Sequence, residues 1–271
     1  MINYTKEIEE KLNKLKSYIK DKGSLAIGFS GGVDSTFLLM VAHEVLGDKA
    51  VAITAVDASL PKRELDEATR FCSEHKIRHI SCKVDPMVEE EYRHNGRRRC
   101  YYCKKIIFSK IKDIADGEGI SFVAEGSNMD DMGDYRPGFE AIKELEIVSP
   151  LQIAGLYKEE IRTISKTLNL PTWNKPSYAC LASRFAYGED ITEEKLHMIE
   201  QAEDILIGLG FYNERVRLHG NIARIEVSAS DIERLASSDI RNFVHDRFKE
   251  LGFDFVTIDM KGYRLGSMNT V

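Results

Sequence analysis

Residues 24–35 read Ser-Leu-Ala-Ile-Gly-Phe-Ser-Gly-Gly-Val-Asp-Ser, an apolar run followed by a glycine-rich turn. The apolar run at 24–29 predicts a strand buried on both faces, and the apolar pattern of 34–46 predicts a helix. Two consecutive glycines let the backbone approach a phosphate closely, and the free N–H groups at the start of a helix attract that anion. The stretch therefore predicts a phosphate-binding loop between a strand and a helix.

Five residues of this loop are the predicted contacts to ATP: Ser30, Gly31, Gly32, Asp34 and Ser35. The glycine amides and serine hydroxyls are suited to phosphate oxygens, and the carboxylate to the magnesium that accompanies ATP. The lysine of a Walker P-loop is absent. The alternative is a turn without a ligand, but five fixed residues arise by chance in such a chain with odds on the order of 10⁻³ or less.

The segments around this loop alternate between strand and helix patterns. Strand patterns occur at 24–29, 50–54, 78–82 and 121–125, with helical patterns at 34–46, 64–75 and 104–115 between them, and further elements at 148–151 and 158–168. This alternation predicts an α/β fold, a parallel sheet flanked by helices.

A long loop at 171–190 separates this region from a second pattern. Beyond it are helical patterns at 192–209 and within 230–251, and strand patterns at 215–218, 222–227 and 255–260. We expect two domains: a nucleotide-binding domain over residues 1–180, and a smaller α+β domain over 181–271 for substrate binding and oligomerisation.

The overall composition excludes several classes of protein. The 271 residues are 43% apolar and 30% charged, which rules out intrinsic disorder and low-complexity scaffolds. The formal net charge of −6 argues against a dedicated nucleic-acid binder, since phosphate neutralisation needs a basic surface. No run approaches the roughly 18 apolar residues of a spanning helix, and the first 21 residues mix Lys and Glu where a signal peptide would be apolar. We expect a cytoplasmic protein without a membrane segment.

A second polar segment, Glu125-Gly-Ser-Asn-Met-Asp-Asp131, follows the strand pattern at 121–125. Because ligands gather at the carboxyl ends of parallel strands, Gly126 and Asn128 are predicted to contact ATP and Asp130 to hold magnesium. An acidic turn that caps the next segment is the alternative. Residues 54–59 follow the second strand pattern, where base contacts usually fall.

Five cysteines, an odd number, suggest metal binding or chemistry before disulfides. Cys72 and Cys82 lie in helix and strand patterns, where cysteine is most often a small buried hydrophobe. Cys100 and Cys103 form a C-x-x-C that suits a metal, a cluster or a redox pair, and His94 is the nearest further zinc ligand. The basic run at 97–105 fits an anionic cluster, an anionic substrate or a solvated face.

Cys180 lies within the long loop at 171–190, where a structural cysteine is not expected. Cys180 is therefore a candidate reactive centre.

The sequence Ser30-Gly-Gly-Val-Asp-Ser35 resembles the PP-loop of the ATP pyrophosphatases, which split ATP between the α- and β-phosphates and adenylate a substrate oxygen. With this loop and four further motifs, most of the chain resembles the LarE family. The further motifs are residues 126–128, 134–138, 149–151 and 179–184. The resemblance implies that a carboxylate of pyridinium-3,5-biscarboxylic acid mononucleotide is adenylated and converted to a thiocarboxylate, in nickel-pincer cofactor synthesis. In one branch of the family the cysteine matching Cys180 gives up its own sulfur and becomes dehydroalanine.

This chain differs from the single-cysteine pattern by Cys100 and Cys103. Three cysteines can anchor a 4Fe-4S cluster and leave one iron without a protein ligand. The resemblance to the cluster-dependent branch implies that Cys100, Cys103 and Cys180 hold such a cluster, and that sulfide bound to it attacks the acyl-adenylate. Sacrificial sulfur donation from Cys180 is the alternative.

An anionic substrate needs cationic recognition, and four arginines are the candidates because guanidinium matches such groups bidentately: Arg136, Arg184, Arg215 and Arg217. Glu226 is a weaker candidate for a substrate or metal contact. The expected partners are this nucleotide substrate, sulfide or a sulfur-donor protein, and further copies of the chain in a homo-oligomer. tRNA thiolation is a second enzymatic interpretation, and a zinc-stabilised ATP-binding regulator is a non-enzymatic one.

Overall fold

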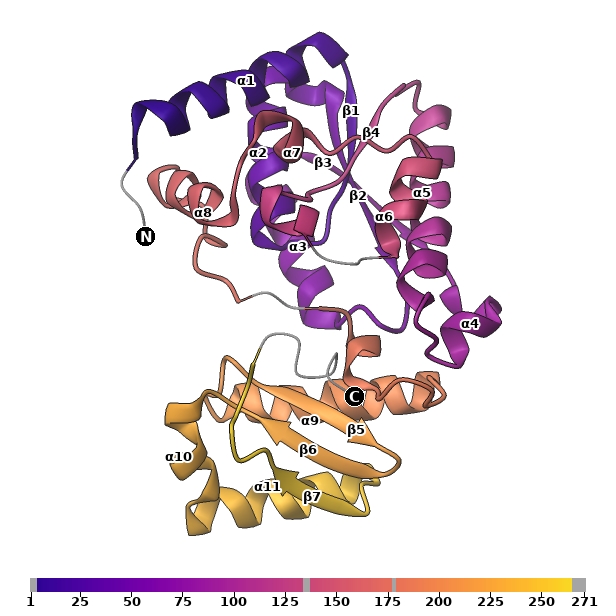
Figure 1. The fold of residues 1–271 in the computed structure, drawn as a ribbon, viewed down its shortest axis with the longest axis vertical. Helices are drawn as coiled ribbons and strands as arrows, with labels where there is room; N and C mark the ends of the chain where they lie inside the picture. The colour runs from indigo at the N-terminus through magenta and orange to yellow at the C-terminus, as the bar shows by residue number, and fades with distance from the viewer. Residues whose placement is uncertain (1–3, 134–136, 177–178, 265–271) are drawn as a thin grey trace. The chain divides into compact units, whose positions relative to one another are not determined.

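The computed structural model describes residues 4–133, 137–176 and 179–264 (Figure 1). The chain forms two compact units, of which the first comprises Met1–Pro86 and Cys100–Tyr178. The second comprises Met87–Arg99 and Ala179–Val271. A short segment that precedes Cys100 in the chain is therefore part of the second unit.

The first unit is built on a parallel sheet with the strand order β3-β2-β1-β4. Its strands are β1 (Leu25–Gly28), β2 (Ala50–Val56), β3 (Arg78–Lys83) and β4 (Val123–Ala124). The predicted α/β class with a parallel sheet is confirmed. The further element at 148–151 contributes a single parallel bridge between Val148 and Ala124, after which Pro150 begins a helix.

Helices cover both faces of this sheet (Figure 1). Leu25 and Ile27 of β1 point into a core shared with α1, α2, α3, α7 and α8, whereas Ala26 points into a core with α5 and α6. The bounds are α1 (Lys6–Lys22), α2 (Val33–Leu46), α3 (Lys62–Glu74), α5 (Arg99–Gly117), α6 (Gly138–Glu144), α7 (Pro150–Ala154) and α8 (Lys158–Thr167). Alternate residues of a strand face opposite sides, so the all-apolar run at 24–29 produces a strand buried on both faces.

The second unit is a small mixed sheet with helices, as the sequence predicts. Strand β6 pairs with β5 antiparallel and with β7 parallel. Its elements are α4 (Glu90–Arg93), α9 (Glu193–Gly208), β5 (Arg215–His219), β6 (Ile222–Glu226), α10 (Ile232–Ala236), α11 (Ser238–Leu251) and β7 (Phe255–Ile258). Short 3₁₀ turns complete the chain at η1 (Gly47–Lys49), η2 (Pro86–Val88), η3 (Met129–Gly133), η4 (Leu181–Arg184) and η5 (Ala229–Asp231). Among the described residues, no helix is long and apolar enough to cross a membrane.

Candidate active site

The predicted phosphate loop lies between the end of β1 and the start of α2. Gly31 has a φ of +69°, which favours glycine, and a Cβ there would lie 3.4 Å from the Cβ of Ala68. Gly32 is the N-cap of α2 and has extended backbone. The hydroxyl oxygens of Ser30 and Ser35 lie 3.1 Å apart. The loop therefore presents two hydroxyls and the free amides of a helix N-terminus, the donor set that binds phosphate.

Gly126 packs directly against the start of α2. A Cβ on Gly126 would lie 3.0 Å from the amide nitrogen of Ser35, so only glycine fits without a shift. The strand order explains the proximity, since β1 pairs with β2 on one side and with β4 on the other. Ligands of open α/β sheets bind at such a reversal of strand order. The structure thus brings two segments predicted to bind ATP together at this edge.

The polar turn after Gly126 is held by its own side chains. Asn128 is 3% exposed, and its Oδ1 accepts a 2.9 Å hydrogen bond from the amide of Asp130. An oxygen of Asp131 accepts from the amide of Asn128 at 3.0 Å, and Oδ2 of Asp130 accepts from the amide of Lys158 at 2.7 Å. The acidic side chains of this turn therefore cap backbone amides, as expected if the segment is an acidic turn that caps the next element. At the end of β2, the Thr54 hydroxyl donates to the carbonyl of Phe29 at 2.7 Å.

Asp34 forms an ion pair with Lys158 at the start of α8. Burial raises the pKa of the Asp34 carboxyl, and the Lys158 charge acts in the opposite direction without overcoming it. A second lysine, Lys175, lies at the same loop, where its ammonium is 3.4 Å from the carbonyl oxygen of Gly31 and 2.8 Å from Glu64. Sequence reasoning missed both lysines, because each comes from a segment far from the loop along the chain and neither belongs to a local motif.

The five thiols fall into two groups. Burial raises the pKa of Cys72 to about 12 and also raises that of Cys82, so both stay protonated. Cys100 and Cys180 are exposed and Cys103 is half-buried. This division agrees with the assignment of the first two as buried hydrophobes.

Helix α5 begins at Arg99 and not at Lys104, so the C-x-x-C lies in its first turn. Cys100 and Cys103 are three residues apart on this helix and share a face. Tyr101, between them, is 8% exposed and donates a 2.8 Å hydrogen bond to Glu144, which also binds Lys105 at 3.3 Å. The tyrosine therefore anchors this turn of helix to α6.

The described parts of the chain contain no group of three or more His, Cys, Asp or Glu with metal-binding geometry. The donor chemistry of the exposed thiols nevertheless suits an iron-sulfur cluster, because thiolates ligate iron and buried, protonated thiols do not. His94, the further zinc ligand suggested by the sequence, has its Nδ1 2.5 Å from the Oδ1 of Asp190.

Arg184 holds the loop that carries Cys180. It is fully buried, and its guanidinium donates to the carbonyl oxygen of Ala179 at 3.0 Å and to the hydroxyl of Ser183 at 2.9 Å. Glu203 on α9 accepts two hydrogen bonds from the same guanidinium. Burial acts to raise the pKa of Glu203, but the Arg184 charge and its hydrogen bonds outweigh that effect and lower it.

Two more arginines hold the same loop. Arg217 donates to the carbonyl of Ser183 at 3.1 Å and pairs with Glu226, which is fully buried. Arg99, the residue before Cys100, donates to the carbonyl of Ala182 at 2.8 Å. The segment after Cys180 is thus fixed through its backbone carbonyls by charged donors, which form stronger hydrogen bonds than neutral ones.

The structure describes one of the two remaining predicted arginines, Arg215, and not the other. Arg215 is 2% exposed, and its guanidinium lies 4.8 Å from the ring centre of Tyr263. It shares a face of β5 with Arg217, as the sequence predicts. Arg136 lies outside the described residues. Glu203 was missed by sequence reasoning, although its place on the apolar stripe of α9, with Leu196, Ile199 and Leu206, is a signal that could have found it.

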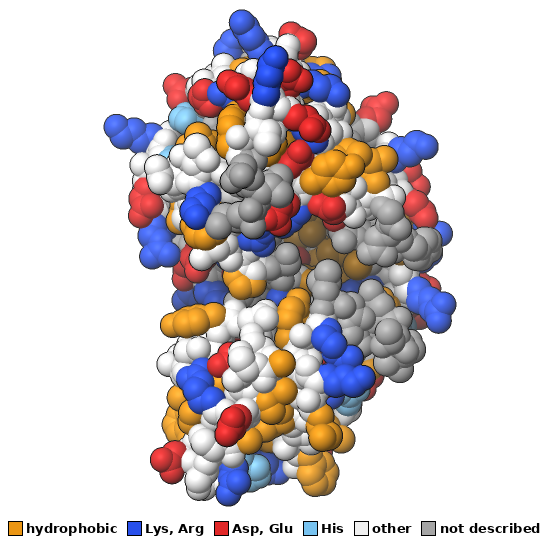
Figure 2. Space-filling view, turned by 60° about the vertical axis from the view of Figure 1, so that its left-hand side comes forward, with side chains coloured by type: hydrophobic (Ala, Val, Ile, Leu, Met, Phe, Trp, Pro, Cys, Tyr) orange, Lys and Arg blue, Asp and Glu red, His pale blue; other side chains and the backbone are white. Residues whose placement is uncertain are grey.

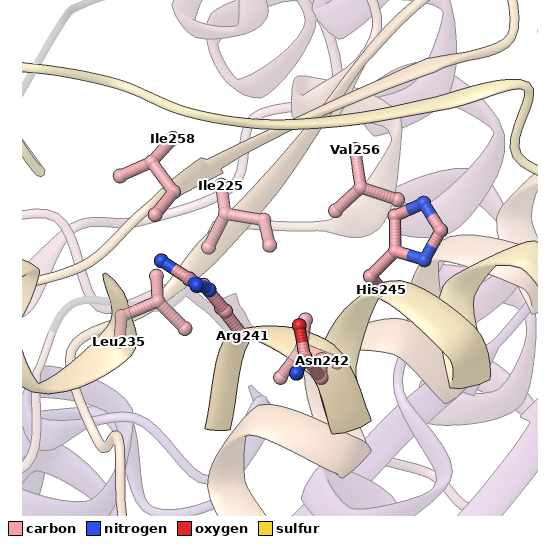
Figure 3. Close-up of a pocket in the computed structure, with 8 residues that line it drawn as sticks. Ile225, Leu235, Arg241, Asn242, His245, Val256 and Ile258 are labelled. Carbon is pink, nitrogen blue, oxygen red and sulfur yellow. The ribbon is translucent and has the colours of Figure 1, made fainter. Parts of the chain in front are cut away.

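A separate cavity of about 300 Å³ lies in the second unit (Figure 3). Ile225, Val256 and Ile258 of the sheet and Leu235 of α10 face it, and Arg241 and His245 of α11 lie at its edge. None of the residues predicted for the active site lines this cavity.

Comparison with known proteins agrees with this geometry. A family model described as a PP-loop domain matches residues 4–134. A GMP synthase of Maridesulfovibrio salexigens is 25% identical over 227 residues, which cover 73% of this chain and 42% of that protein. The loop after β1 and these similarities define a PP-loop ATP pyrophosphatase.

Two relatives are similar over nearly the whole chain. The pyridinium-3,5-bisthiocarboxylic acid mononucleotide synthase of Lactiplantibacillus plantarum is 35% identical over 256 residues, covering 94% of this chain and 92% of that protein. An uncharacterised protein of Synechocystis is 40% identical over 264 residues, covering 97% and 98% of the two chains. The chain belongs to the LarE family and is an ATP-dependent sulfurtransferase.

Proposed function

We propose that this enzyme adenylates a carboxylate of pyridinium-3,5-biscarboxylic acid mononucleotide and converts it to a thiocarboxylate, a step of nickel-pincer cofactor synthesis. The relative in Lactiplantibacillus plantarum is named for the bisthiocarboxylic acid product of this chemistry. The observation that carries the proposal is an exposed Cys180, on a loop fixed by buried Arg184, in a chain that also has a phosphate loop.

The reaction has two steps. A carboxylate oxygen of the substrate attacks the α-phosphorus of ATP, which is bound through Ser30, Gly31, Gly32, Asp34 and Ser35 with Gly126 and Asn128 beside them, and pyrophosphate leaves. A sulfur nucleophile then attacks the acyl carbon, and AMP leaves with the oxygen that bridged it to the acyl group. Adenylation is needed because oxide is a poor leaving group and AMP a good one. Asp34 and Asp130 are the residues that would hold magnesium, which when bound would offset part of the charge of the phosphates.

We further propose that Cys100, Cys103 and Cys180 hold a 4Fe-4S cluster. Three thiolates leave one iron without a protein ligand, and when bound, the cluster supplies a place for external sulfide. The exposed or half-buried state of these three thiols supports the assignment. Sulfide, or a protein that donates it, is then a partner.

The C-terminal domain expected from the sequence, residues 181–271, is proposed to bind the anionic substrate and to mediate homo-oligomer formation. Arg136 and Arg215 remain the proposed contacts to substrate carboxylate and phosphate groups, and Arg217 is proposed to contact them by exchanging its bond to Glu226 or Ser183. Arg184 is assigned a positioning role, because its donors already bind Glu203, Ala179 and Ser183. We propose that the reaction takes place in the cytoplasm, where thiols stay reduced.

Metal analysis tests the cluster. Protein reconstituted anaerobically with iron and sulfide should contain about four of each per chain, and Cys100→Ala, Cys103→Ala and Cys180→Ala should each lose most of that content. Cys82→Ala is the matched control, because it removes a buried thiol and should retain full iron. Iron-free wild-type protein would refute the cluster and favour sulfur donation from Cys180 itself, and stoichiometric zinc in place of iron would refute it as well.

Intact mass and product analysis separate the remaining alternatives. A loss of about 34 Da at Cys180 after turnover, the mass of H₂S, would show sacrificial sulfur donation. Release of pyrophosphate only when tRNA is added would show tRNA thiolation. On the face in Figure 2, basic and acidic side chains are interspersed, which gives little support to an RNA-binding surface.

A further inference from the structure

Lys175 lies between the phosphate loop and α3. Its ammonium is 2.8 Å from a carboxylate oxygen of Glu64 and 2.7 Å from one of Glu67, both on α3, and 3.4 Å from the carbonyl oxygen of Gly31. The Lys175 side chain is 13% exposed. Helix α3 packs closely on the loop here, since a Cβ on Gly31 would lie 3.4 Å from the Cβ of Ala68. A single ammonium therefore joins the loop to this helix.

The charges around Lys175 do not suit a direct contact with phosphate. One ammonium faces two carboxylates, so the three side chains together have one excess negative charge. A phosphate that approached the ammonium would also approach Glu64 and Glu67, and like charges repel. Any effect of Lys175 on ATP binding must therefore act through the loop group that it contacts, the carbonyl of Gly31.

The peptide between Gly31 and Gly32 has its two polar ends on opposite sides. The described residues contain no cis peptide bond, and in a trans peptide the C=O and the N–H point in opposite directions. The carbonyl of Gly31 accepts from Lys175, whereas the amide of Gly32 donates to the hydroxyl of Ser30 at 3.4 Å. The hydroxyl of Ser35 lies 3.1 Å from that of Ser30. The amide thus faces the two hydroxyls predicted to bind phosphate, and the lysine is on the other side.

This peptide needs an external support because both of its residues are glycines. Glycine restricts rotation about the backbone bonds less than any other residue, and Gly31 has a φ of +69°. A rotated peptide would turn the Gly31 carbonyl oxygen toward the phosphates, which would repel it. An ammonium at the carbonyl opposes that rotation. It also polarises the peptide, so that the amide of Gly32 becomes a stronger donor.

Lys175 is itself fixed through its main chain as well as its side chain. The guanidinium of Arg162 on α8 donates to the carbonyl of Trp173 at 2.7 Å and to that of Lys175 at 2.8 Å. Glu64, in the first turn of α3, is buried and holds the ammonium. A group that orients part of a binding site must be held in this way by its own neighbours.

We propose that Lys175 is a positioning residue for ATP. Its ammonium holds the Gly31–Gly32 peptide with the carbonyl toward α3 and the amide of Gly32 toward the phosphates, and Glu64 and Glu67 hold the ammonium in turn. The inference rests on the proposed function only in that this loop binds ATP. It is independent of the sulfur chemistry.

The sequence allows this one peptide to be observed directly, because Gly31 and Gly32 are the only adjacent glycines in the chain. When glycine alone carries a ¹³C carbonyl and ¹⁵N, a spectrum that correlates a carbonyl with the following nitrogen contains a single peak. A hydrogen bond to a carbonyl oxygen moves its ¹³C resonance downfield. Lys175→Met should therefore move the peak upfield, and Lys175→Arg, which can still donate, should keep it near the wild-type position. An unchanged peak in Lys175→Met would refute the proposal.

Calorimetric titration with magnesium pyrophosphate measures the consequence for binding. Lys175→Met should weaken binding by about three- to tenfold, the range for one misaligned hydrogen bond, and Lys175→Arg should recover most of the affinity. Arg70→Met is the matched control, because it removes an exposed positive charge from α3 and should bind normally. Wild-type affinity in Lys175→Met would contradict the proposed role.

Two further variants separate positioning from other roles. Lys175→Met leaves the buried Glu64 without one counter-charge, so Lys175→Met/Glu64→Gln repeats the test without that cost and should bind as weakly. Wild-type affinity in this double variant would refute the proposal. Glu64→Gln and Glu67→Gln each remove one negative charge. Tighter binding in Glu64→Gln than in Glu67→Gln would mean that a released Lys175 contacts phosphate itself, which would also refute the proposal.

Circular dichroism of each variant confirms that it is folded. Wild-type protein that does not bind pyrophosphate would contradict the proposed function and would leave the spectroscopic result unaffected.

Discussion

Arg184 and Glu203 form a bidentate ion pair in which both side chains are fully buried. Nε donates to Oε1 at 2.7 Å, and Nη2 donates to Oε2 at 3.1 Å. The remaining guanidinium nitrogen is then oriented toward the carbonyl of Ala179, the residue before Cys180. Glu203 on α9 therefore fixes the backbone at the cysteine through one intermediate side chain.

Removing the carboxylate charge should destabilise the second unit. Glu203→Gln leaves the Arg184 guanidinium buried without its counter-charge, a change that costs about 3–5 kcal/mol in comparable buried pairs. Urea unfolding should show a lower midpoint with an unchanged slope. Asp204→Asn, at the adjacent and exposed position on α9, should have little effect. Equal stability of the two variants would show that the pair contributes nothing to the fold.

The same pair predicts a particular dependence on pH. The pKa of Glu203 is lowered in the folded protein, because the opposing charge of Arg184 outweighs burial. The unfolded state then binds the proton more readily, so this group stabilises the fold above its unfolded pKa of about 4.3 and loses that contribution as the pH falls through its folded pKa. Wild-type stability should decline below about pH 4 more steeply than that of Glu203→Gln. Parallel declines would contradict the shift.

A methyl group at Gly126 should impair the phosphate loop. The Cβ of Gly126→Ala would lie 3.0 Å from the amide nitrogen of Ser35, so the turn after β4 must move away from α2. Affinity for ATP should fall by about three- to tenfold, a cost of about 1 kcal/mol. Gly117→Ala, in α5 with no atom within 4 Å of the new Cβ, is the control and should bind ATP normally. Unchanged ATP affinity in Gly126→Ala would show that the contact is not part of the site.

The sequence predicts those helices and strands whose apolar pattern lies within a short stretch of the chain. The apolar run at 24–29 and the repeated alternation of strands and helices depend on neighbouring residues, and the structure has the strands and helices that they indicate. The sequence predicts the start of α5 at Lys104, which is too late, because residues 99–103 have no apolar period. The sequence leaves the type of the element at 148–151 open, although Pro150 favours the first turn of the helix that begins there.

The site is less predictable, because its pairs join distant parts of the chain. The phosphate loop is recognisable from its own residues. The contact of Lys158 with Asp34 and that of Lys175 with Glu64 each span more than a hundred residues of the chain. The buried state of Arg184 could not be foreseen, since arginine is mostly exposed unless it is paired. Finding Glu203 on the apolar stripe of α9 would have indicated that a buried cation lies opposite.

Thiol labelling should separate the three cysteines of the proposed cluster from the other two. In metal-free protein at pH 8, Cys100, Cys103 and Cys180 should react rapidly with iodoacetamide, because they are exposed or half-buried. A thiol with a pKa of about 12, as for Cys72, is ionised in only about one molecule in 10⁴ at that pH and is shielded as well. Cys72 and Cys82 should therefore react only after denaturation.

Peptide mass spectrometry after brief labelling identifies which thiols have reacted, and the same protein unfolded in guanidinium serves as the control with five labels. Reconstitution with iron and sulfide should then protect Cys100, Cys103 and Cys180 together, since a thiolate bound to iron is a poor nucleophile toward iodoacetamide. Protection of Cys100 and Cys103 with Cys180 still reactive would mean that Cys180 is not a ligand. The proposed three-cysteine cluster would then be refuted, and the sacrificial chemistry of Cys180 would be favoured.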